Sequence, residues 1–266
     1  MNSQLTSIPP FLQNFSVEGK VALVTGGSGG IGFGVCTALA ESGADIVSLQ
    51  LPTEPTETEF ERVGKKCHIY HVDLSKLETI APVMETVMTV HNPSIIINCA
   101  GIIKKGDTTE FPIEDLETVI RVNTTASIVV AREAVKAWLA QPGKAPFNRK
   151  IINFGSISSF QGNLQNIAYV ASKGAVLNMT RGMSNEWAQH GINVNCVAPG
   201  YTKSEMTERT YTNEAYNEQL FKKLPAKRWG EPKDLGAACV YLSCPASDYV
   251  SGTCLVVDGG YLGGLP

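Results

Sequence analysis

A tyrosine and a lysine four residues apart, Tyr169 and Lys173, stand in a stretch of small and apolar residues, SISSFQGNLQNIAYVASKGAV (156–176). Residues four apart on a helix share one face, about 5 to 6 Å apart at Cβ, so the ammonium can approach the phenol. An adjacent cation favours the phenolate and lowers a pKa that is otherwise about 10. The pair therefore predicts a tyrosine that donates and accepts a proton at neutral pH. A solvated surface contact is the alternative.

A second cluster is the glycine-rich segment TGGSGGIG (25–32), which ends an apolar run and opens a helical pattern. Glycines let the backbone approach a pyrophosphate closely, and the start of a helix offers free N–H groups to an anion. The spacing T-G-x-x-x-G-x-G is neither the P-loop pattern nor the usual dinucleotide pattern G-x-G-x-x-G. The segment predicts a nucleotide-binding turn, and a plain glycine turn is the alternative.

Strand-like and helix-like patterns alternate along the chain. Short apolar runs predict buried parallel strands, and longer periodic segments between them predict helices. The alternation predicts an α/β protein with a single-domain Rossmann fold over residues 1–266: a doubly wound, seven-stranded parallel sheet with helices on both faces. Ligands of such a sheet bind beyond the carboxyl ends of its strands. The expected strands are 21–25, 45–50, 67–73, 94–101, 150–156, 192–200 and 253–260, and the expected helices are 31–42, 75–90, 113–140, 168–190 and 233–243.

Three segments carry narrower expectations. Ser75 and Glu78 have the spacing of a capping box that opens the helix 75–90. Residues 1–18 precede the first strand and form an N-terminal extension. Residues 202–228, which we call the flap, are polar and irregular, and we expect them to be a mobile cover for the substrate.

Composition excludes several classes of partner. The chain has 266 residues, 43% hydrophobic and 18% charged, with a formal net charge of -3. This balance argues against a nucleic-acid partner, and the sequence has neither a membrane-spanning apolar run nor a signal-peptide pattern. The seven cysteines include no C-x-x-C pair, which predicts reduced core residues in a cytoplasmic protein. We expect no metal site.

Taken together, the glycine turn and the Tyr169–Lys173 segment resemble the classical short-chain dehydrogenase/reductase family, over about residues 19–260. Five further family motifs follow in the family's order. Two positions depart from its pattern: Cys99 replaces the more usual second asparagine of NNAG, and Ser204 stands where threonine is usual. Both keep a small size or a hydroxyl. The five motifs are Asp73, NCAG (98–101), Asn123 in RVNTT, Ser156, and PG (199–200).

The resemblance implies a catalytic tetrad of Asn123, Ser156, Tyr169 and Lys173. Tyr169 would exchange a proton with the substrate oxygen while a hydride moves to or from a nicotinamide ring, and Lys173 would also bond the nicotinamide ribose. Ser156 would orient the substrate oxygen, and Asn123 would hold a water of the proton relay. Ser156 is chosen because it lies thirteen positions before the tyrosine; Ser158 is the alternative.

The resemblance also implies a dinucleotide pocket. The glycine turn would line the pyrophosphate, the residues after the third and fourth strands would meet the adenosine, and the residues after the sixth would face the nicotinamide. The implied cofactor-binding residues are Gly26, Ser28, Gly30, Ile31, Gly32, Gln50, Asp73, Leu74, Asn98, Ala100, Gly101, Tyr169, Lys173, Pro199, Gly200, Thr202 and Ser204.

The end of the second strand bears on the choice between NAD and NADP. An acidic residue there bonds the ribose 2′-OH of NAD, whereas a nearby arginine accommodates the 2′-phosphate of NADP. Here the position is Gln50, followed by Leu51, and Glu54 and Glu57 would repel a phosphate. The sequence favours NAD and leaves NADP possible.

Longer segments, among them NCAGIIKK and SDYVSGTCLVVDGGYL, resemble the branch that contains 2-deoxy-D-gluconate 3-dehydrogenase and 2-dehydro-3-deoxy-D-gluconate 5-dehydrogenase. That implies a sugar acid or polyol as substrate and a homotetramer. Lys104 or Lys105 could meet the carboxylate, and a solvated lysine pair is the alternative. Two other functions stay open: reduction of another carbonyl class, such as 3-oxoacyl thioesters, and a non-catalytic dinucleotide sensor.

Overall fold

The computed structural model describes residues 9–52, 67–141 and 149–264. Its seven strands form one sheet in the order β3-β2-β1-β4-β5-β6-β7, and every neighbouring pair is parallel. The predicted α/β fold with a seven-stranded parallel sheet is confirmed. The strands are β1 (Val21–Thr25), β2 (Asp45–Gln50), β3 (Cys67–His71), β4 (Ile95–Asn98), β5 (Arg149–Phe154), β6 (Ile192–Pro199) and β7 (Cys254–Val257).

The strand order reverses at β1, which pairs with β2 on one side and with β4 on the other. In the register of the sheet, Thr25 at the end of β1 is level with Asn98 at the end of β4, and Asn98 with Asn153. The turns that leave β1 and β4 therefore stand next to each other. In a doubly wound sheet this is the expected place for a ligand.

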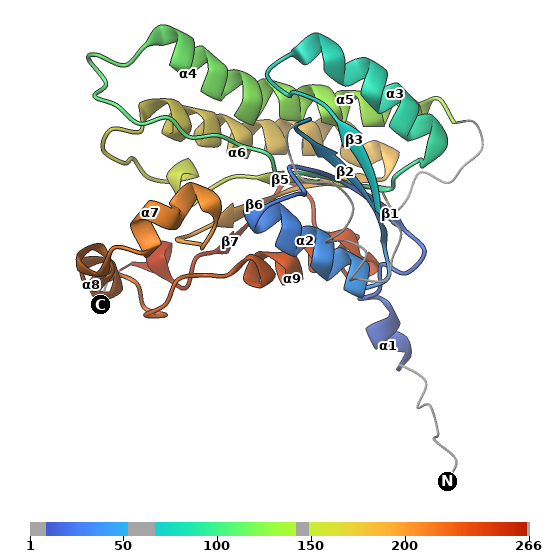
Figure 1. Ribbon diagram of the computed structural model, residues 1–266. Helices are drawn as coiled ribbons and strands as arrows, with labels where there is room; N and C mark the ends of the chain where they lie inside the picture. Colours follow the sequence, from blue (N-terminus) through green and yellow to red (C-terminus); the bar gives the residue numbers. More distant parts are fainter. Residues whose placement is uncertain (1–8, 53–66, 142–148, 265–266) are drawn as a thin grey trace.

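Helices cover both faces of the sheet (Figure 1). The helices α2 and α9 pack together on one face, and α3, α5 and α6 lie on the other, with α4 against α6. Parallel strands buried on both faces need continuous apolar runs, which the central strands β1 and β4 have, whereas the edge strand β3 is only partly buried. The longer helices are α2 (Gly30–Glu41), α3 (Ile80–Val90), α4 (Ile113–Ile120), α5 (Ala126–Leu139), α6 (Ile167–Trp187), α8 (Glu214–Lys223) and α9 (Pro232–Ser243).

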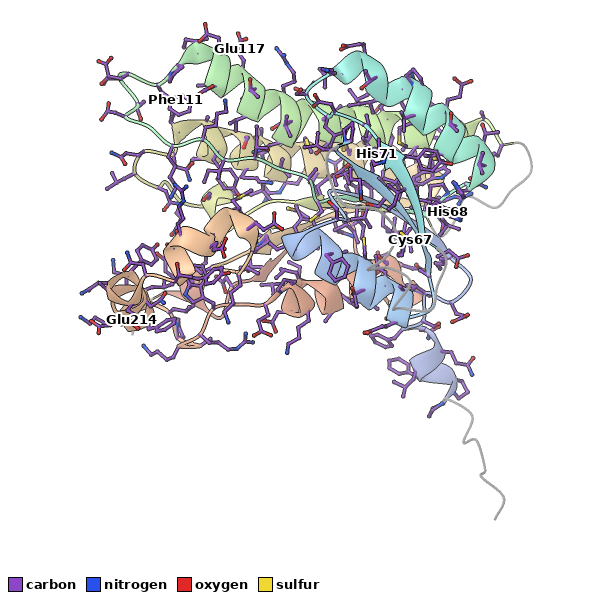
Figure 2. The ribbon with its side chains drawn as sticks, in the orientation of Figure 1. Cys67, His68, His71, Phe111, Glu117 and Glu214 are labelled. Carbon is purple, nitrogen blue, oxygen red and sulfur yellow. The ribbon has the colours of Figure 1, made fainter. Side chains whose placement is uncertain are left out.

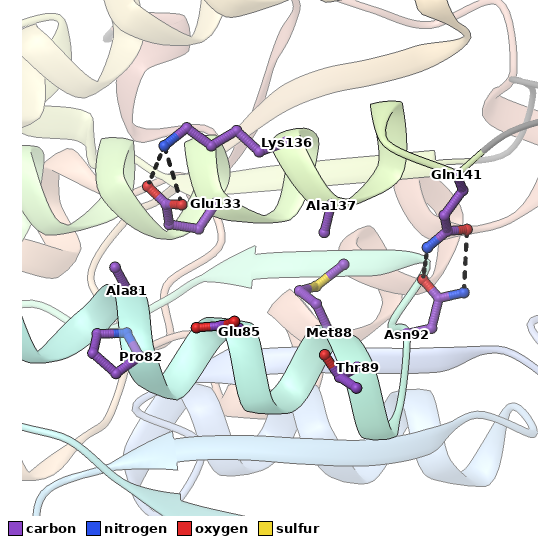
Figure 3. Close-up of a pocket in the computed structure, with 10 residues that line it drawn as sticks. All are labelled: Ala81, Pro82, Glu85, Met88, Thr89, Asn92, Glu133, Lys136, Ala137 and Gln141. Atoms are coloured by element: carbon purple, nitrogen blue, oxygen red, sulfur yellow. Dashed lines mark hydrogen bonds and ion pairs between the residues drawn. The ribbon is translucent and has the colours of Figure 1, made fainter.

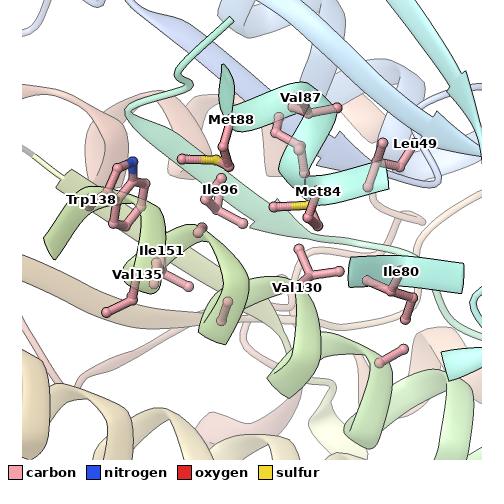
Figure 4. Close-up of a cluster of buried hydrophobic side chains, with 14 of the residues drawn as sticks. Leu49, Ile80, Met84, Val87, Met88, Ile96, Val130, Val135, Trp138 and Ile151 are labelled. Carbon is pink, nitrogen blue, oxygen red and sulfur yellow. The ribbon is translucent and has the colours of Figure 1, made fainter. Parts of the chain in front are cut away.

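One of the two large buried clusters lies under α3 and α5 (Figure 4). Met84 of α3 and Val130 of α5 meet Ile96 and Ile151 of the central strands, and all four side chains are completely buried. Trp138 closes one end of the cluster, where its indole N–H donates to the Pro93 carbonyl over 3.0 Å. This packing holds the central strands, and hence their carboxyl ends, in place.

The predicted helix 113–140 is continuous in direction but not uniform. Between α4 and α5 the residues Arg121–Thr125 form one turn of π-helix. Such turns contain one extra residue and are frequent at functional sites. The turn carries Asn123, which is 1% exposed.

The capping box predicted from Ser75 and Glu78 is wrong. The backbone N–H and the hydroxyl of Ser75 both donate to the Asp73 carboxylate, over 3.0 and 2.7 Å. A short 3-10 turn, Leu77–Thr79, then leads into α3. Asp73 thus holds the loop that leaves β3, the edge strand marked by Cys67, His68 and His71 in Figure 2.

The flap is more regular than its composition predicts, so the expectation of irregular structure is wrong. It contains a 3-10 turn, Glu205–Thr207, and the helices α7 (Glu208–Tyr211) and α8. A small apolar cluster of Leu220, Leu224 and Trp229 attaches it to the body. Its mobility stays a prediction. The remaining short elements are α1 (Pro10–Gln13) and the 3-10 turns Ile157–Ser159, Ala188–His190, Pro245–Ser247 and Tyr261–Gly263.

Two features are absent from the described ranges: a membrane-spanning helix and a cluster of metal ligands. Within them, no helix is both long and apolar enough to cross a bilayer. Within the same ranges, no three His, Cys, Asp or Glu side chains gather closely enough to hold a metal ion.

Candidate active site

A cavity of about 670 Å³ opens at the carboxyl ends of the strands, around the point where the strand order reverses. It brings together predicted site residues from seven separate segments of the sequence. Of the predicted site residues, those that line it are Gly26, Ser28, Gly30, Ile31, Gly32, Gln50, Asp73, Leu74, Ala100, Gly101, Ser156, Tyr169, Lys173, Pro199, Gly200, Thr202 and Ser204.

The glycine turn forms one wall of the cavity, and its shape depends on the missing side chains. Gly26 has a positive φ of 67°, and a Cβ on it would lie 3.1 Å from the Ala100 backbone. A Cβ on Gly32 would lie 1.9 Å from the Gly26 carbonyl oxygen. The turn can therefore close only because these positions are glycine.

The same turn delivers the first turn of α2 to the cavity. The N-cap residue is Gly29, and among the described residues no side chain caps this helix. The first N–H groups of a helix have no partner inside it, and together with the helix dipole they favour an anion. The free N–H groups of the first turn of α2, which we call the cradle, lie beside the glycine turn, where the backbone can approach a ligand closely. This arrangement fits the pyrophosphate of a dinucleotide.

Thr25 joins the glycine turn to the loop after β4. Its hydroxyl accepts hydrogen bonds from the backbone N–H groups of Cys99 and Ala100, both over 3.1 Å. The threonine of the glycine motif thus fixes the second wall of the cavity.

Asn98 does not line the cavity, in contrast to the sequence prediction. Its amide nitrogen donates to the Asn153 side chain over 2.9 Å and to the Ser127 carbonyl over 3.2 Å. It is 2% exposed and lies beneath the loop that it begins. These two bonds tie the end of β4, where the loop begins, to β5 and α5.

Tyr169 and Ser156 meet in the cavity. Tyr169 lies in the first turn of α6, Ser156 follows β5, and their side chains share a hydrogen bond. Burial raises the pKa of the Tyr169 phenol, and the hydrogen bond with Ser156 opposes that rise only in part. The lowered pKa predicted from the sequence is therefore wrong for this structure.

The position of Lys173 explains this result. Its Nζ lies 5.6 Å from the centre of the Tyr169 ring and donates a hydrogen bond of 2.6 Å to the carbonyl oxygen of Phe154. The ammonium is thus on the same helical face as the tyrosine but is held by the end of β5. Burial lowers the pKa of Lys173 to about 8.

The three serines of SISS have different surroundings. Ser156 lines the cavity and accepts a hydrogen bond from the Ser158 backbone N–H over 3.1 Å. The Ser158 hydroxyl accepts from the Asn163 side chain over 3.0 Å and is not part of the cavity wall. Ser159 donates to the Lys173 carbonyl over 2.7 Å and so ties the turn to α6. The geometry favours Ser156 over Ser158 as the serine next to the tyrosine.

Asn123 also lies behind the cavity wall. Its carboxamide exchanges two hydrogen bonds with the backbone of Ile102, accepting over 2.8 Å and donating over 3.0 Å, and donates to the Ser172 hydroxyl over 3.0 Å. A Cβ on Gly101 would lie 3.3 Å from the Asn123 oxygen and 3.6 Å from Lys173 Nζ. The π-helical turn thus brings the asparagine close to the lysine, while its side chain is used to hold the loop after β4.

The adenosine end of the cavity is formed by β2 and by the loop after β3. Gln50 is 3% exposed and accepts a hydrogen bond from the Ser48 hydroxyl over 3.1 Å. Among the described residues that line the cavity, Lys173 of α6 is the only lysine or arginine, and it is bonded to the end of β5, beyond β1 and β4. Glu54 and Glu57, which were expected to repel a 2′-phosphate, lie outside the described residues.

Lys104 and Lys105 do not line the cavity. Lys104 forms an ion pair of 2.5 Å with Asp115 of α4, and Lys105 is exposed. A substrate contact by Lys104 would have to compete with this carboxylate.

Sequence reasoning missed part of the wall that comes from the flap. Glu205, Met206 and Thr207 line the cavity together with Ser204. Thr118 and Val122, from the junction of α4 and the π-helical turn, complete the apolar side. Only the three-residue spacing from Ser204 to Thr207, a capping box in the structure, marks this segment in the sequence.

A second hollow, of about 660 Å³, lies between α3 and α5, away from these residues (Figure 3). Four of its polar side chains are joined in pairs: Lys136 donates to Glu133 over 3.1 Å, and Gln141 donates to Asn92 over 3.0 Å. Only the second pair joins the two elements, because Asn92 follows α3 and Gln141 follows α5, whereas Glu133 and Lys136 are both on α5.

Comparison with known proteins identifies the family. A family model described as enoyl-(acyl carrier protein) reductase matches residues 26–262. The chain belongs to the short-chain dehydrogenase/reductase family. This short-chain dehydrogenase/reductase is 39% identical over 254 residues to the 2-dehydro-3-deoxy-D-gluconate 5-dehydrogenase of Escherichia coli (strain K12), covering 94% of this chain and 98% of that protein.

Two other relatives have similar names. The 5-keto-D-gluconate 5-reductase of Escherichia coli (strain K12) is 38% identical over 252 residues, covering 93% of this chain and 97% of that protein. The crystal structure of a gluconate 5-dehydrogenase from Burkholderia cenocepacia J2315, in complex with NADP and tartrate, superposes with a TM-score of 0.86 at 30% identity, covering 96% of this chain and 100% of that one. The short-chain dehydrogenase/reductase described here thus has the same fold as these proteins over nearly its whole length.

Proposed function

We propose that this chain is an NAD(P)-dependent oxidoreductase that interconverts a secondary alcohol and a ketone of a sugar acid or polyol. The observation that carries the proposal is the meeting of Ser156, Tyr169 and Lys173 in one cavity with the glycine turn. A proton donor and a dinucleotide cradle in a shared space are what this reaction needs.

Each of these residues has a defined task. Tyr169, whose raised pKa keeps the phenol protonated at neutral pH, donates its proton to the substrate oxygen during reduction of a ketone. Ser156, hydrogen bonded to that phenol, orients the same oxygen. Lys173 places a positive charge near the ring and stabilises the phenolate that forms, because an opposite charge favours the ionised form. In the oxidation of an alcohol the proton moves back along the same path.

The nicotinamide, when bound, supplies the chemistry that the side chains lack: it accepts or donates the hydride. The chain would hold it through the first turn of α2 at the pyrophosphate, Asp73 and Leu74 at the adenine, and Pro199, Gly200, Thr202 and Ser204 at the nicotinamide. Asn98 and Asn123 would act by supporting the loop after β4. We favour NAD, because the residue that ends β2 is Gln50, an uncharged side chain that offers no cation to a 2′-phosphate.

The names of the relatives support a sugar-acid substrate. All three act on a gluconate or deoxygluconate according to their names, and one structure holds tartrate, a hydroxy acid. The description of the matching family model, which mentions an acyl carrier protein, keeps a 3-oxoacyl thioester as the second candidate. A dinucleotide sensor would have no need of the Ser156, Tyr169 and Lys173 arrangement.

We also propose a homotetramer located in the cytoplasm. Exposed apolar side chains on α4, α5 and the start of α6, namely Ile113, Ile128, Leu139 and Ile167, support an association of subunits through these helices. Sedimentation of the purified protein tests the oligomeric state.

The activity is tested with the purified protein and a substrate panel. Gluconate-type sugar acids, their neutral polyol and ketose analogues, and a 3-oxoacyl thioester are each assayed with NAD(H) and NADP(H), by following the absorbance of the reduced nicotinamide. We expect turnover with a sugar acid or polyol and NAD. Turnover of the thioester alone would favour the second candidate, and dinucleotide binding without turnover of any substrate would favour a sensor.

A further inference from the structure

The carboxylate of Glu205 lies beside the N-terminus of α2, where the cavity offers free backbone N–H groups to an anion. A Cβ on Gly29 would lie 3.3 Å from Glu205 Oε1 and 3.8 Å from Oε2. Gly29 is the N-cap residue of α2, so the carboxylate is beside the first turn of that helix. Glu205 also lines the cavity. A negative charge at a helix N-terminus is stabilised by the helix dipole.

The flap holds this carboxylate in position. The Thr207 hydroxyl donates to the Thr202 carbonyl over 2.7 Å and accepts from the Ser204 backbone N–H over 3.0 Å. The Ser204 side chain in turn lies against the glycine turn, 3.1 Å from a Cβ placed on Gly30. The 3-10 turn that carries Glu205 is therefore braced on both sides.

The charge has no counterpart nearby in the described chain. Of the described residues, no lysine, arginine or histidine forms an ion pair with Glu205. A diphosphate that enters the cradle brings a second negative group to the same helix end. Two anions at one helix N-terminus repel each other and compete for the same N–H groups.

We propose that Glu205 is a competing anion of the protein itself, which occupies the phosphate end of the cradle before the dinucleotide binds and weakens its binding. The inference rests on the proposed function, because it takes the cavity as the dinucleotide site. When the dinucleotide binds, the carboxylate must turn away from α2 or remain beside a second negative group. Glu205 thereby sets the affinity for the cofactor and favours its release after each turnover.

The test compares Glu205→Gln with Glu208→Gln, each in the full-length protein. Gln keeps the size of the side chain and removes only its charge. Glu208 is an exposed glutamate three residues further on, outside the cavity wall. Calorimetric dissociation constants are measured for NAD, for ADP, which keeps the diphosphate, and for adenosine, which has no phosphate.

We expect Glu205→Gln to tighten the binding of NAD and ADP by about two- to fivefold at low salt. The gain should shrink at high salt, since the side chain is exposed and its charge is screened. Adenosine should bind equally to both proteins, and Glu208→Gln should resemble the wild type.

Unchanged or weaker binding of NAD by Glu205→Gln would overturn the inference and leave the proposed function intact. An equal gain for adenosine would also overturn it, because the effect would then not act on the phosphates. Failure of the wild type to bind any dinucleotide would instead contradict the proposed function.

Discussion

The ammonium of Lys173 is hydrogen bonded to the carbonyl oxygen of Phe154, 2.6 Å away, and not to the tyrosine one helical turn before it. Lys173 thus connects α6 to the end of β5 and places a buried charge at the floor of the cavity. Burial lowers the pKa of Lys173 and raises that of Tyr169, so both groups are shifted toward their neutral forms.

Lys173 predicts a change of stability with pH. Its pKa is about 8 in the folded protein and ordinarily 10.5. Below the folded value both states hold the proton, and the folded state bears the full cost of a buried cation. Between the two values the unfolded chain binds more protons, so the free energy of unfolding rises with pH. We expect the wild type to gain about 2 kcal/mol relative to Lys173→Met between about pH 7.5 and 9.5.

Urea unfolding of the two cofactor-free proteins at both pH values measures this difference. If the free energies of unfolding of the two proteins differ by the same amount at both pH values, the pKa of Lys173 is not lowered in the folded protein.

Tyr169→Phe should abolish turnover and leave dinucleotide binding nearly unchanged. The substitution removes the proton that is transferred but keeps the ring and its packing. Steady-state kinetics give the turnover, and fluorescence titration gives the dissociation constant of NAD. A kcat near that of the wild type would eliminate Tyr169 as the general acid.

The two serines form a matched pair for a second test. Ser156→Ala should lower kcat by about 10²-fold or more, because Ser156 is hydrogen bonded to the phenol and faces the cavity. Ser158→Ala should change kcat little, since its hydroxyl accepts only from Asn163 outside the cavity wall. The opposite ranking of the two variants would show that Ser158 is the serine that orients the substrate.

Gln50 predicts the cofactor preference. We expect the wild type to have the higher kcat/KM with NAD, and Gln50→Arg to shift the preference toward NADP by about 1.5 to 3 kcal/mol, through charge-assisted hydrogen bonds to the 2′-phosphate. Gln50→Met serves as the control, because it removes the amide without adding a charge. A preference of the wild type for NADP would contradict this interpretation of β2.

Lys104 and Lys105 test how a substrate carboxylate is recognised. The Lys104 ammonium is already paired with Asp115. We therefore expect Lys105→Met to raise KM for a sugar acid about tenfold, which corresponds to about 1.5 kcal/mol, and to change KM for the neutral analogue little. Lys104→Met should leave both KM values nearly unchanged. If the KM values for the acid and the neutral substrate rise equally, or if neither rises, both lysines are solvated surface residues without a part in carboxylate recognition.

Much of the fold could be predicted because it depends on local patterns. Short apolar runs predict strands, and their alternation with helical segments predicts a doubly wound parallel sheet. The positions of most site motifs followed as well, because the glycine turn, Asp73, NCAG, Ser156 and PG lie at or just after carboxyl ends of strands. The glycines at 26 and 32 also predicted a tight turn, and the structure shows why glycine is needed there: a Cβ at either position would lie too close to the backbone.

What the sequence could not determine are properties that depend on the surroundings of a side chain. The spacing of Tyr169 and Lys173 established that they share a helical face, but the direction of their pKa shifts depends on burial and on the Phe154 carbonyl, which lies nineteen residues before Lys173. In the same way, Asn98 and Asn123 were found by their motifs, yet only tertiary contacts show that their amides are bonded to protein groups behind the cavity. Glu205 has no local signal at all, because it comes to lie beside Gly29 only when the flap folds over the glycine turn.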